Sequence, residues 1–412
     1  MRIAKIIACI VTMLALTADA QQTSPPSKRT VIAANTIFDG KGGVLRNTRI
    51  VIEGSKIVAI DPKAGPVDYD LRGLTVLPGW IDAHVHITWS FGADGKNKNE
   101  NGATVEGAYA AASNAWLTLM AGFTTVQNVG SAVPLRDAIA KGLLPGPRVL
   151  TGVEGLVGRG DQSGTPEEIR AYVRKQKEAG ADLIKIYAAA GMLEGSKTLS
   201  QEQLNAVCDE ANKQGLRTLV HAYRDAVSAA TAAGCTQIEH GLGATDEDLK
   251  TMAAKGTYLD PQAGLLLETY LLFKDRYVGT PFFPATLEAF ESMAGLLPIN
   301  HEFVKRAAKI PGLKIVFGTD AVAGAHGRNA EEFIDRVRDC GVDPMQAMIS
   351  ANSLGAQALG MANQIGSISS GLEADIIALD GDPLKDITAV RRVVFVMKGG
   401  IVYKNTVGRT RQ

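Results

Sequence analysis

The pattern of apolar positions divides the chain into two β-rich ends and a long middle region. Short alternating apolar runs separated by glycine turns lie between residues 30 and 60, and the same texture returns between residues 374 and 405. Segments of this length predict short strands joined by tight turns. We therefore expect one small β-sandwich domain built from both chain ends, with halves at 30–75 and 366–407.

The middle region, residues 76–365, alternates strand patterns with amphipathic helix patterns. Its predicted strands are 76–87, 124–129, 148–153, 183–188, 217–222, 237–241, 257–262 and 314–320. The predicted helices 166–179 and 200–214 begin at capping residues, Thr165 and Ser200. Eight strands, most followed by a helix, predict an α/β fold with a (β/α)8 TIM-type barrel. A doubly wound open sheet is the alternative, but no Gly-x-Gly-x-x-Gly motif follows the first strand.

The seventh strand–helix unit of this barrel is oversized. Residues 265–309 contain two Tyr, five Phe and three Pro. One interpretation is a repacked helical hairpin. The other is a lid over the barrel mouth, because catalytic loops all leave that face of the fold.

The first 20 residues have the order of regions found in a signal peptide. Arg2 and Lys5 precede an apolar run at 6–16, and Ala18-Asp19-Ala20 resembles a cleavage site. We expect residues 1–20 to be removed, 21–29 to form a tether, and the protein to be exported by a bacterium to the periplasm or medium. A buried N-terminal helix is the alternative.

Composition narrows the class of partner. Hydrophobic residues make up 46% of the chain, which excludes general disorder. Lys+Arg and Asp+Glu both number 43, and without an excess of basic residues a nucleic-acid partner is not expected. The mature chain should have no membrane anchor. Cys208, Cys235 and Cys340 allow at most one disulfide, and we expect small buried thiols on helices without a catalytic role.

Histidines gather at the ends of the predicted strands. His84 and His86 are two residues apart on one strand, so both side chains point to the same face. His221 and His240 end two further strands, which places four of the six histidines on the catalytic face. One such pair is weak evidence, but four converging imidazoles indicate a bound cation.

Two charged residues extend this cluster. Asp320 ends the eighth predicted strand, where a buried unpaired carboxylate would be costly; it is either a helix N-cap or a metal ligand that also transfers protons. Lys185 ends the fourth strand, where a free ammonium beside cations would be repelled. A neutral amine could take up carbon dioxide and become a carbamate, whose two oxygens would suit two metals.

The motifs together resemble the amidohydrolase superfamily, in its binuclear-metal branch with a carboxylated lysine. The matching segments are Pro78-Gly79-x-Ile81-Asp82-x-His84-x-His86, Gly122-Phe123-Thr124-Thr125-Val126, Gly318-Thr319-Asp320, Gly366-Ser367-Ile368-x-x-Gly371-x-x-Ala374-Asp375 and Asp380-Gly381-Asp382-Pro383-Leu384, with Lys185, His221 and His240. The resemblance implies two divalent metals, for which zinc is favoured over manganese or cobalt. It assigns His84, His86, Lys185 and Asp320 to the buried metal.

The exposed metal would take the other carbamate oxygen of Lys185 together with His221 and His240, and Asp320 would act as general base and then acid. Within the superfamily the chain resembles the imidazolonepropionase-like prolidases and carboxypeptidases, whose relatives often form homo-oligomers. The implied reaction is hydrolysis of dipeptides or N-acyl amino acids, with ochratoxin A, cleaved to its isocoumarin acid and phenylalanine, among the expected substrates. The alternatives are a cyclic amide or lactone hydrolase and a binding barrel without catalysis.

The substrate contacts are the least determined part of the site. Tyr187 and Tyr223 lie two residues beyond Lys185 and His221 on the same strand faces, so both can reach a substrate above the metals. Tyr223 matches a family position that meets the substrate carboxylate, and Arg224 and Arg159 are candidates for the opposing positive charge. Some relatives carry a helper histidine near 151–155, but this chain has none between His86 and His221. His326 or His301 could replace it, unless each is an ordinary surface histidine.

Overall fold

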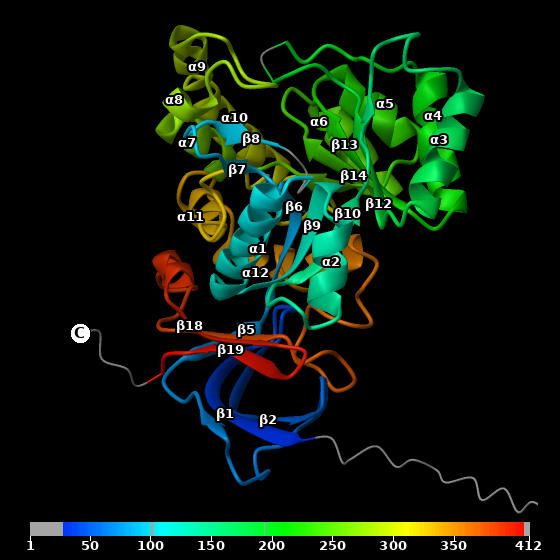
Figure 1. Cartoon of the computed structure of the whole chain (residues 1–412). Coiled ribbons are helices and arrows are strands. Elements are labelled where there is room, and N and C mark those ends of the chain that lie inside the picture. Colours follow the sequence, from blue (N-terminus) through cyan, green and yellow to red (C-terminus); the bar gives the residue numbers. More distant parts are fainter. Residues whose placement is uncertain (1–27, 100–102, 193, 408–412) are drawn as a thin grey trace, which may run out of the picture.

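The computed structural model describes residues 28–99, 103–192 and 194–407. The predicted signal peptide, 1–20, and most of the predicted tether, 21–29, lie outside the described residues. The described part has a β-rich end formed by both chain ends, below a larger body of strands and helices (Figure 1).

Strands from both chain ends pair in one sheet. Its members are β1 (Arg29–Phe38), β2 (Val44–Glu53), β3 (Lys56–Ile60), β4 (Tyr69–Asp70), β5 (Thr75–Pro78), β17 (Ile376–Leu379), β18 (Val393–Lys398) and β19 (Ile401–Asn405). The order is β19-β18-β17-β5-β1-β2-β3, with β4 beside β1, so the two ends meet where β17 runs antiparallel to β5. The alternation of apolar residues puts Ile32, Ile50, Ile376 and Phe395 in one core. Strand pairing does not divide these strands into two sheets, so the sandwich stays a prediction.

The first predicted strand of the middle region, 76–87, is two strands in different sheets. The chain leaves the terminal sheet at the end of β5 and enters the middle region as β6 (Trp80–Val85). Gly79 makes this junction possible: its N–H donates to the Asp375 carbonyl at 2.9 Å, and a Cβ there would lie 2.2 Å from Thr124 Oγ1. The apolar run continues across the junction because both strands are buried.

The strands of the middle region pair in parallel and mostly in chain order. One sheet holds β10 (Arg148–Gly152), β9 (Phe123–Ser131) and β6. The other holds β11 (Leu156–Val157), β12 (Leu183–Tyr187), β13 (Arg217–Ala222), β14 (Gln237–His240), β15 (Tyr258–Asp260) and β16 (Lys314–Ile315). All eight predicted strand regions therefore contain strands, in an α/β arrangement. Parallel strands bring their carboxyl ends to one edge, where the predicted site residues lie.

The eighth predicted strand, 314–320, is shorter than expected, because regular pairing ends at Ile315. Beyond it the backbone turns to other partners. Phe317 donates its N–H to the Ser350 carbonyl, while the Ala83 N–H donates to Phe317 at 2.8 Å and the His86 N–H donates to Ala321 at 2.8 Å. These bonds link β6 to the segment that carries Asp320.

Helices cover the outside of the parallel strands (Figure 1). They are α1 (Val105–Met120), α2 (Val133–Ala140), α3 (Pro166–Glu178), α4 (Gln201–Lys213), α5 (Asp225–Ala232), α6 (Asp246–Lys255), α11 (Glu331–Arg338), α12 (Pro344–Ser350) and α13 (Ser353–Ala358). The predicted starts of α3 and α4 are confirmed: Thr165 and Ser200 each form a capping box with the residue three positions later. Each box satisfies backbone N–H groups that the first helical turn would otherwise leave unpaired.

The oversized unit at 265–309 consists of short helices that pack near the strand ends. They are α7 (Leu265–Leu272), α8 (Lys274–Tyr277), α9 (Leu287–Met293) and α10 (Leu296–Ala307). Buried residues of α7, α8 and α9 share one apolar cluster with Val322 and Ala323, which follow Asp320, and with Trp89 and Phe91. The hairpin β7 (Ser90–Phe91) and β8 (Asn97–Lys98) lies beside them. The insertion is therefore part of the surroundings of the predicted site.

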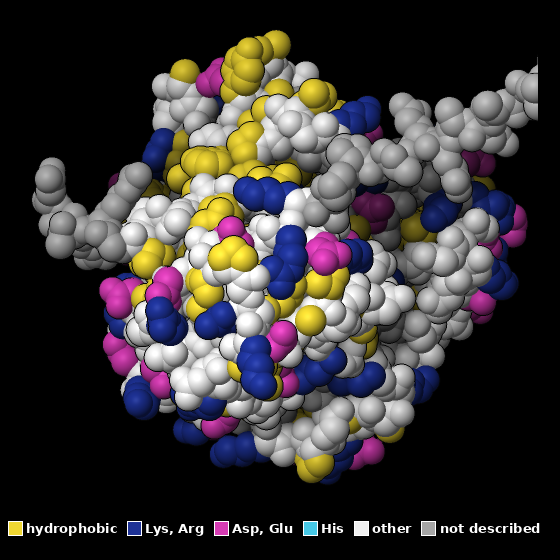
Figure 2. All heavy atoms as spheres, turned by 90° about the horizontal axis from the view of Figure 1, so that it is seen from below, with side chains coloured by type: hydrophobic (Ala, Val, Ile, Leu, Met, Phe, Trp, Pro, Cys, Tyr) yellow, Lys and Arg dark blue, Asp and Glu magenta, His cyan; other side chains and the backbone are white. Residues whose placement is uncertain are grey.

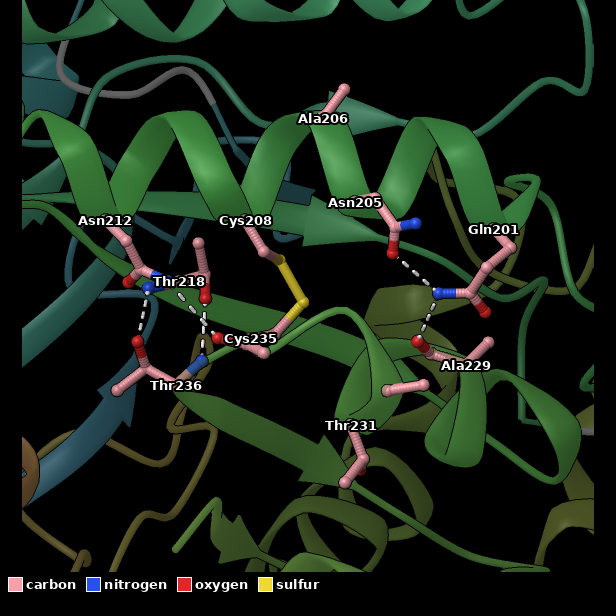
Figure 3. Close-up of a disulfide and its surroundings, with 12 residues drawn as sticks. Gln201, Asn205, Ala206, Cys208, Asn212, Thr218, Ala229, Thr231, Cys235 and Thr236 are labelled. Atoms are coloured by element: carbon pink, nitrogen blue, oxygen red, sulfur yellow. Dashed lines mark hydrogen bonds between the residues drawn. A yellow bond between two sulfur atoms is a disulfide. The ribbon is translucent and has the colours of Figure 1, made fainter. Parts of the chain in front are cut away.

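Two of the three cysteines in the described residues are not the free thiols that were expected. Cys208 on α4 and Cys235, which precedes β14, form a disulfide 27 residues apart in sequence (Figure 3). Both are buried between α4 and the neighbouring strands, and the loop that they close contains all of β13, including His221. Closing a loop of this size typically stabilises a fold by roughly 2–4 kcal/mol. Cys340 is the buried free thiol that was expected.

The surface mixes charges of both signs. On the face seen in Figure 2, basic and acidic side chains are interspersed with small apolar areas. This agrees with the equal numbers of acidic and basic residues in the chain. Among the helices of the described ranges, none has both the length and the apolar character needed to cross a bilayer.

Candidate metal centre

Three of the predicted ligands meet where β6 and the segment after β16 end. His84 Nε2 lies 3.3 Å from Asp320 Oδ1, and His86 Nε2 lies 3.0 Å from the same oxygen. His84 lies on β6 and His86 directly follows it, so their side chains share one face of the strand, as the sequence pattern predicted. All three side chains are buried. Their ligand atoms lie within 4.8 Å of one another, which is close enough for one ion to contact all three.

The donors of this group fit a cation. Among the described residues, His84 Nε2 and Asp320 Oδ1 are buried without a hydrogen-bond partner. A buried polar atom without a partner is costly, so both atoms need a partner of another kind. Imidazole nitrogen and carboxylate oxygen are ordinary ligands of zinc and related divalent metals.

Backbone strain coincides with the strand ends that carry this site. His240 and Asp320 have φ values of 66° and 50°, in the left-handed region that few non-glycine residues adopt. Arg224 and Gln262, which follow β13 and β15, have φ values of 49° and 44°. Strained residues of this kind persist where the surrounding structure holds them, typically at functional sites.

The other two predicted histidines form a second pair beside the first group. His240 Nε2 lies 2.9 Å from His221 Nδ1, and the centroid of the His240 ring is 5.9 Å from that of His84. Two ring nitrogens lie this close only where one of them carries a proton and donates it to the other, or where both contact a shared cation. The structure thus brings the four predicted histidines close together.

Lys185 lies fully buried in the same centre. Its side chain is 1% exposed, and its Nζ is 5.2 Å from the centroid of the Tyr187 ring. Burial lowers the pKa of Lys185, although Glu239 and Asp320 oppose the shift. Lys185 acts electrostatically on His86, His221 and His240, so it is near both groups of ligands.

The surroundings of His86, His221 and His240 keep these three histidines neutral. Burial is the largest cause in each case: it lowers the pKa of His221 to about 3 and lowers the pKa values of His86 and His240 as well. Burial opposes ionisation of Asp320, but His84 and His86 outweigh it and lower the pKa of that carboxyl. Neutral imidazoles and an ionised carboxylate are the forms that bind metals.

Glu239 is the most important residue that sequence reasoning missed. Its Oε2 lies 2.6 Å from His84 Nδ1, and its Oε1 accepts a hydrogen bond from Gln237 at 2.9 Å. Gln262 donates to the Oε2 atom at 3.2 Å and accepts the backbone N–H of His240 at 3.1 Å. Glu239 thus fixes the ring of His84 so that Nε2 faces Asp320. Its position beside His240 was the available signal.

Asp82 ties the two strand ends of the site together. Its carboxylate accepts the backbone N–H groups of His84 at 3.2 Å and Thr319 at 3.0 Å, and the Thr319 hydroxyl and Asn329 amide donate to it at 2.6 and 2.8 Å. Burial raises the pKa of Asp82 to about 6 despite these bonds. The family motif contained Asp82, but only the structure assigns it this bracing role.

The two predicted tyrosines lie at the site. Tyr223 stacks on His240, with ring centroids 5.1 Å apart and planes at 17°, and Tyr187 lies 5.7 Å from the His221 ring. Burial raises the pKa of Tyr223 well above its usual range and that of Tyr187 to about 12, so both phenols keep their protons. Both can therefore donate a hydrogen bond to a substrate.

The remaining substrate candidates, which are Arg224, His326, Arg159 and His301, have different surroundings. Arg224 follows Tyr223 and lines a cavity of about 630 Å³ with Met192 and Phe303. His326 is buried near His86, and burial lowers the pKa of His326 to about 4. Among the contacts of the described residues, none joins the other two candidates, Arg159 and His301, to the metal centre.

Arg159 is exposed in a turn, where its backbone N–H donates to Ser163 Oγ. His301 lies on α10 and acts on Glu268 rather than on a predicted ligand. The assignment of both to the substrate site stays a prediction.

Comparison with known proteins agrees with this geometry. The model of the amidohydrolase family matches residues 75–402. Ochratoxinase from Aspergillus niger is 28% identical over 92% of this chain and 87% of its own length. A crystal structure of a Xaa-Pro dipeptidase with methionine in its active site superimposes with a TM-score of 0.80 at 30% identity, covering 92% of this chain and all of the dipeptidase. A prolidase complexed with N-methylphosphonate-L-proline gives 0.81 at 26% identity, with coverage of 92% and 100%.

Proposed function

Because the chain belongs to the amidohydrolase family and is a metal-dependent hydrolase, we propose that it cleaves N-acyl amino acids and dipeptides. Hydrolysis at their amide bond releases the C-terminal amino acid. Two neighbouring features carry the proposal. One is the buried cluster of histidines with Asp320, and the other is the protonated Tyr223, which stacks on His240 of that cluster. The first suits amide hydrolysis, and the second offers a donor to a carboxylate beside the scissile bond.

The proposed centre holds two divalent metals. His84, His86 and Asp320 would hold one, and His221 and His240 the other, with zinc favoured by the donor set. When bound, the metals supply an activated water and polarise the scissile carbonyl. The protein holds the ligands in place through Glu239 and Asp82.

Lys185 is proposed as the bridging ligand in its carboxylated form. The neutral ε-amine adds carbon dioxide and releases one proton, which leaves a carbamate with two oxygens. Complete burial and a lowered pKa favour the neutral amine that this addition needs. Lys185 acts electrostatically on a member of each histidine group, His86 and His221, which supports a carbamate that would reach both metals.

Asp320 is proposed as the group that moves the proton. Its carboxylate takes a proton from the attacking water and gives it to the nitrogen of the leaving amino acid. The lowered pKa of Asp320 keeps it ionised before each cycle. Its Oδ1, 3.0 Å from His86 Nε2, lies at the centre of the ligand group.

Tyr223 is proposed to bind the carboxylate of the released amino acid. Its hydroxyl keeps its proton, and its ring lies over His240 and 4.9 Å from His221. Arg224, the next residue, adds positive charge on this side of the site. A bond between a phenol and a carboxylate is charge-assisted and therefore stronger than one between neutral groups.

We further propose that the parallel strands close into the eight-stranded barrel expected from the sequence. The hydrogen bonds from Ala83 to Phe317 and from His86 to Ala321 support closure on one side, and the bond from the Asp182 N–H to Thr151 supports continuity on the other. Export from the cytoplasm is also proposed. The disulfide between Cys208 and Cys235 supports it, because such bonds persist mainly in oxidising compartments.

A hydrolysis panel tests the proposed function. N-acyl amino acids, dipeptides and ochratoxin A, with the similarity to ochratoxinase as the reason for the last, are incubated with the metal-loaded protein. Release of the free amino acid, measured by chromatography, is expected for substrates with a free carboxylate. Turnover of cyclic amides or lactones alone would contradict the proposal. So would metal binding without hydrolysis of any member of the panel.

A further inference from the structure

An aromatic side chain directly follows the metal-binding strand. Trp89 is three residues beyond His86, and its ring centroid lies 4.3 Å from that of His86, with the planes at 44°. Trp89 is only partly buried, and its ring contacts two phenylalanines of the insertion, Phe282 and Phe283. It therefore links a predicted metal ligand to the segment between α8 and α9.

The two phenylalanines of that segment differ in their packing. Phe283 is packed inward, with ring centroids 4.9 Å from Tyr270, 4.6 Å from Tyr277 and 6.0 Å from Phe290. Phe282 is 82% exposed. Since the packing of Phe283 anchors the turn, Phe282 is held at the surface rather than free to move into the core.

The backbone of Phe282 is strained to keep the ring there. Its φ is 73°, in the left-handed region, which is an outlier for a bulky residue. Its ring lies 6.4 Å from that of Trp89, and the two planes are nearly parallel, at 13°. Strained residues cluster at functional sites, and an exposed aromatic face offers a stacking surface to a further ring.

We propose that Trp89 and Phe282 form an aromatic platform that binds a planar aromatic ring in the acyl part of the substrate. The preferred substrates would then be N-aroyl amino acids, in which the ring is attached at the scissile carbonyl. This inference rests on the proposed function and deepens it. It places the two ends of the substrate on opposite groups of ligands.

The arrangement of the centre supports that orientation. Tyr223, proposed to bind the carboxylate, stacks on His240, whereas Trp89 lies against His86. The rings of His240 and His86 are both next to His84, at 5.9 and 5.6 Å. An amide held over the metals would thus extend its amino acid toward Tyr223 and its acyl ring toward Trp89.

Two substrates with the same leaving group separate acyl recognition from catalysis. N-(2-naphthoyl)-L-phenylalanine and N-acetyl-L-phenylalanine are compared with wild type, Phe282→Ala and Phe282→Tyr. We expect Phe282→Ala to lower kcat/KM for the naphthoyl substrate on the order of 10-fold, mainly through KM. The acetyl substrate should change less than about twofold, and Phe282→Tyr, which keeps the ring, should resemble wild type.

Leu272→Ala is the matched control. Leu272 is 63% exposed on α7 of the same insertion, so this variant also removes an exposed apolar side chain. It should leave both substrates unchanged. Equal losses on both substrates in Phe282→Ala, or no loss on the naphthoyl substrate, would overturn the proposal.

A binding measurement distinguishes failure of this inference from failure of the proposed function. Calorimetric titration of 2-naphthoate into the metal-loaded protein requires no turnover. Weaker binding to both Phe282→Ala and Trp89→Leu than to wild type supports the platform, even if neither amide is hydrolysed. Equal binding to wild type and Phe282→Ala rejects the platform, even if both amides are hydrolysed.

Discussion

Oε2 of Glu239 lies 2.6 Å from Nδ1 of His84, and the two side chains are almost completely buried. This contact fixes which nitrogen of His84 faces the metal centre. A histidine that binds a metal through one nitrogen depends on the partner of the other for its orientation and basicity.

Glu239→Gln should therefore weaken metal binding without unfolding the protein. The glutamine keeps the shape of the side chain but loses the charge, and its amide cannot accept bonds from Gln237, Gln262 and His84 together. We expect metal affinity to fall roughly 10- to 100-fold, measured by competition with a chelator. Glu167→Gln, at an exposed ion pair on α3, is the control. Unchanged affinity in Glu239→Gln would show that the contact does not orient His84.

Lys185→Ala should remove the metal bridge and nearly all activity while the fold survives. The side chain is buried near His221, and its loss leaves a space that a short carboxylic acid could fill. Metal content and turnover are measured with and without added propionate, and partial rescue is expected. Lys177→Ala on the surface of α3 should change neither quantity. Full activity of a metal-loaded Lys185→Ala enzyme would exclude the carbamate.

Asp320→Asn tests the proton transfer. The amide is nearly the same size and can still contact His86, but it cannot accept a proton at ordinary pH. We predict a fall in kcat on the order of 100-fold or more. The rate is compared at equal metal occupancy, determined on the same samples. A variant within a few-fold of wild type would mean that another group is the base.

Tyr223→Phe tests recognition of the substrate carboxylate. Removing the hydroxyl should reduce kcat/KM about 10- to 150-fold for substrates with a free carboxylate, since such a bond contributes roughly 1.5–3 kcal/mol. The loss should be much smaller for the matching methyl esters or amides. Because Phe keeps the ring that stacks on His240, the stack itself should survive. Equal losses on acids and esters would reject the assignment.

Asp335 should make stability depend on pH. Burial, with the nearby carboxylates of Glu332 and Glu268, raises the pKa of Asp335 from 3.8 to about 9. Between these values the unfolded chain releases a proton that the folded chain keeps. Stability therefore falls as pH rises through this window, by up to about 1.4 kcal/mol per pH unit, and levels off above it.

Asp335→Asn removes this dependence while keeping the size of the side chain, which packs against Gly264. Free energies of unfolding from urea titrations at pH 5 and pH 8 should show the advantage of the variant growing by about 1–4 kcal/mol over this range. Asp339→Asn, at the exposed end of the same helix, serves as control. An advantage that stays constant with pH would contradict the prediction.

The sequence alone determined the family, the parallel strand–helix alternation and six ligand candidates. These features depend on local rules: the period of two places His84 and His86 on one face, and parallel strands bring their carboxyl ends to one edge. The same rules located Lys185 and Tyr223, because each continues the pattern of its own strand.

Only the tertiary structure decided which residues support those ligands. Glu239 contacts His84 across 155 positions of sequence, and Thr319 contacts Asp82 across 237, so no local pattern announces either bond. The disulfide was one of several possible pairings until α4 and the residues before β14 were placed together. The surroundings of Arg159 and His301 likewise depend on what their segments pack against, which no local pattern determines.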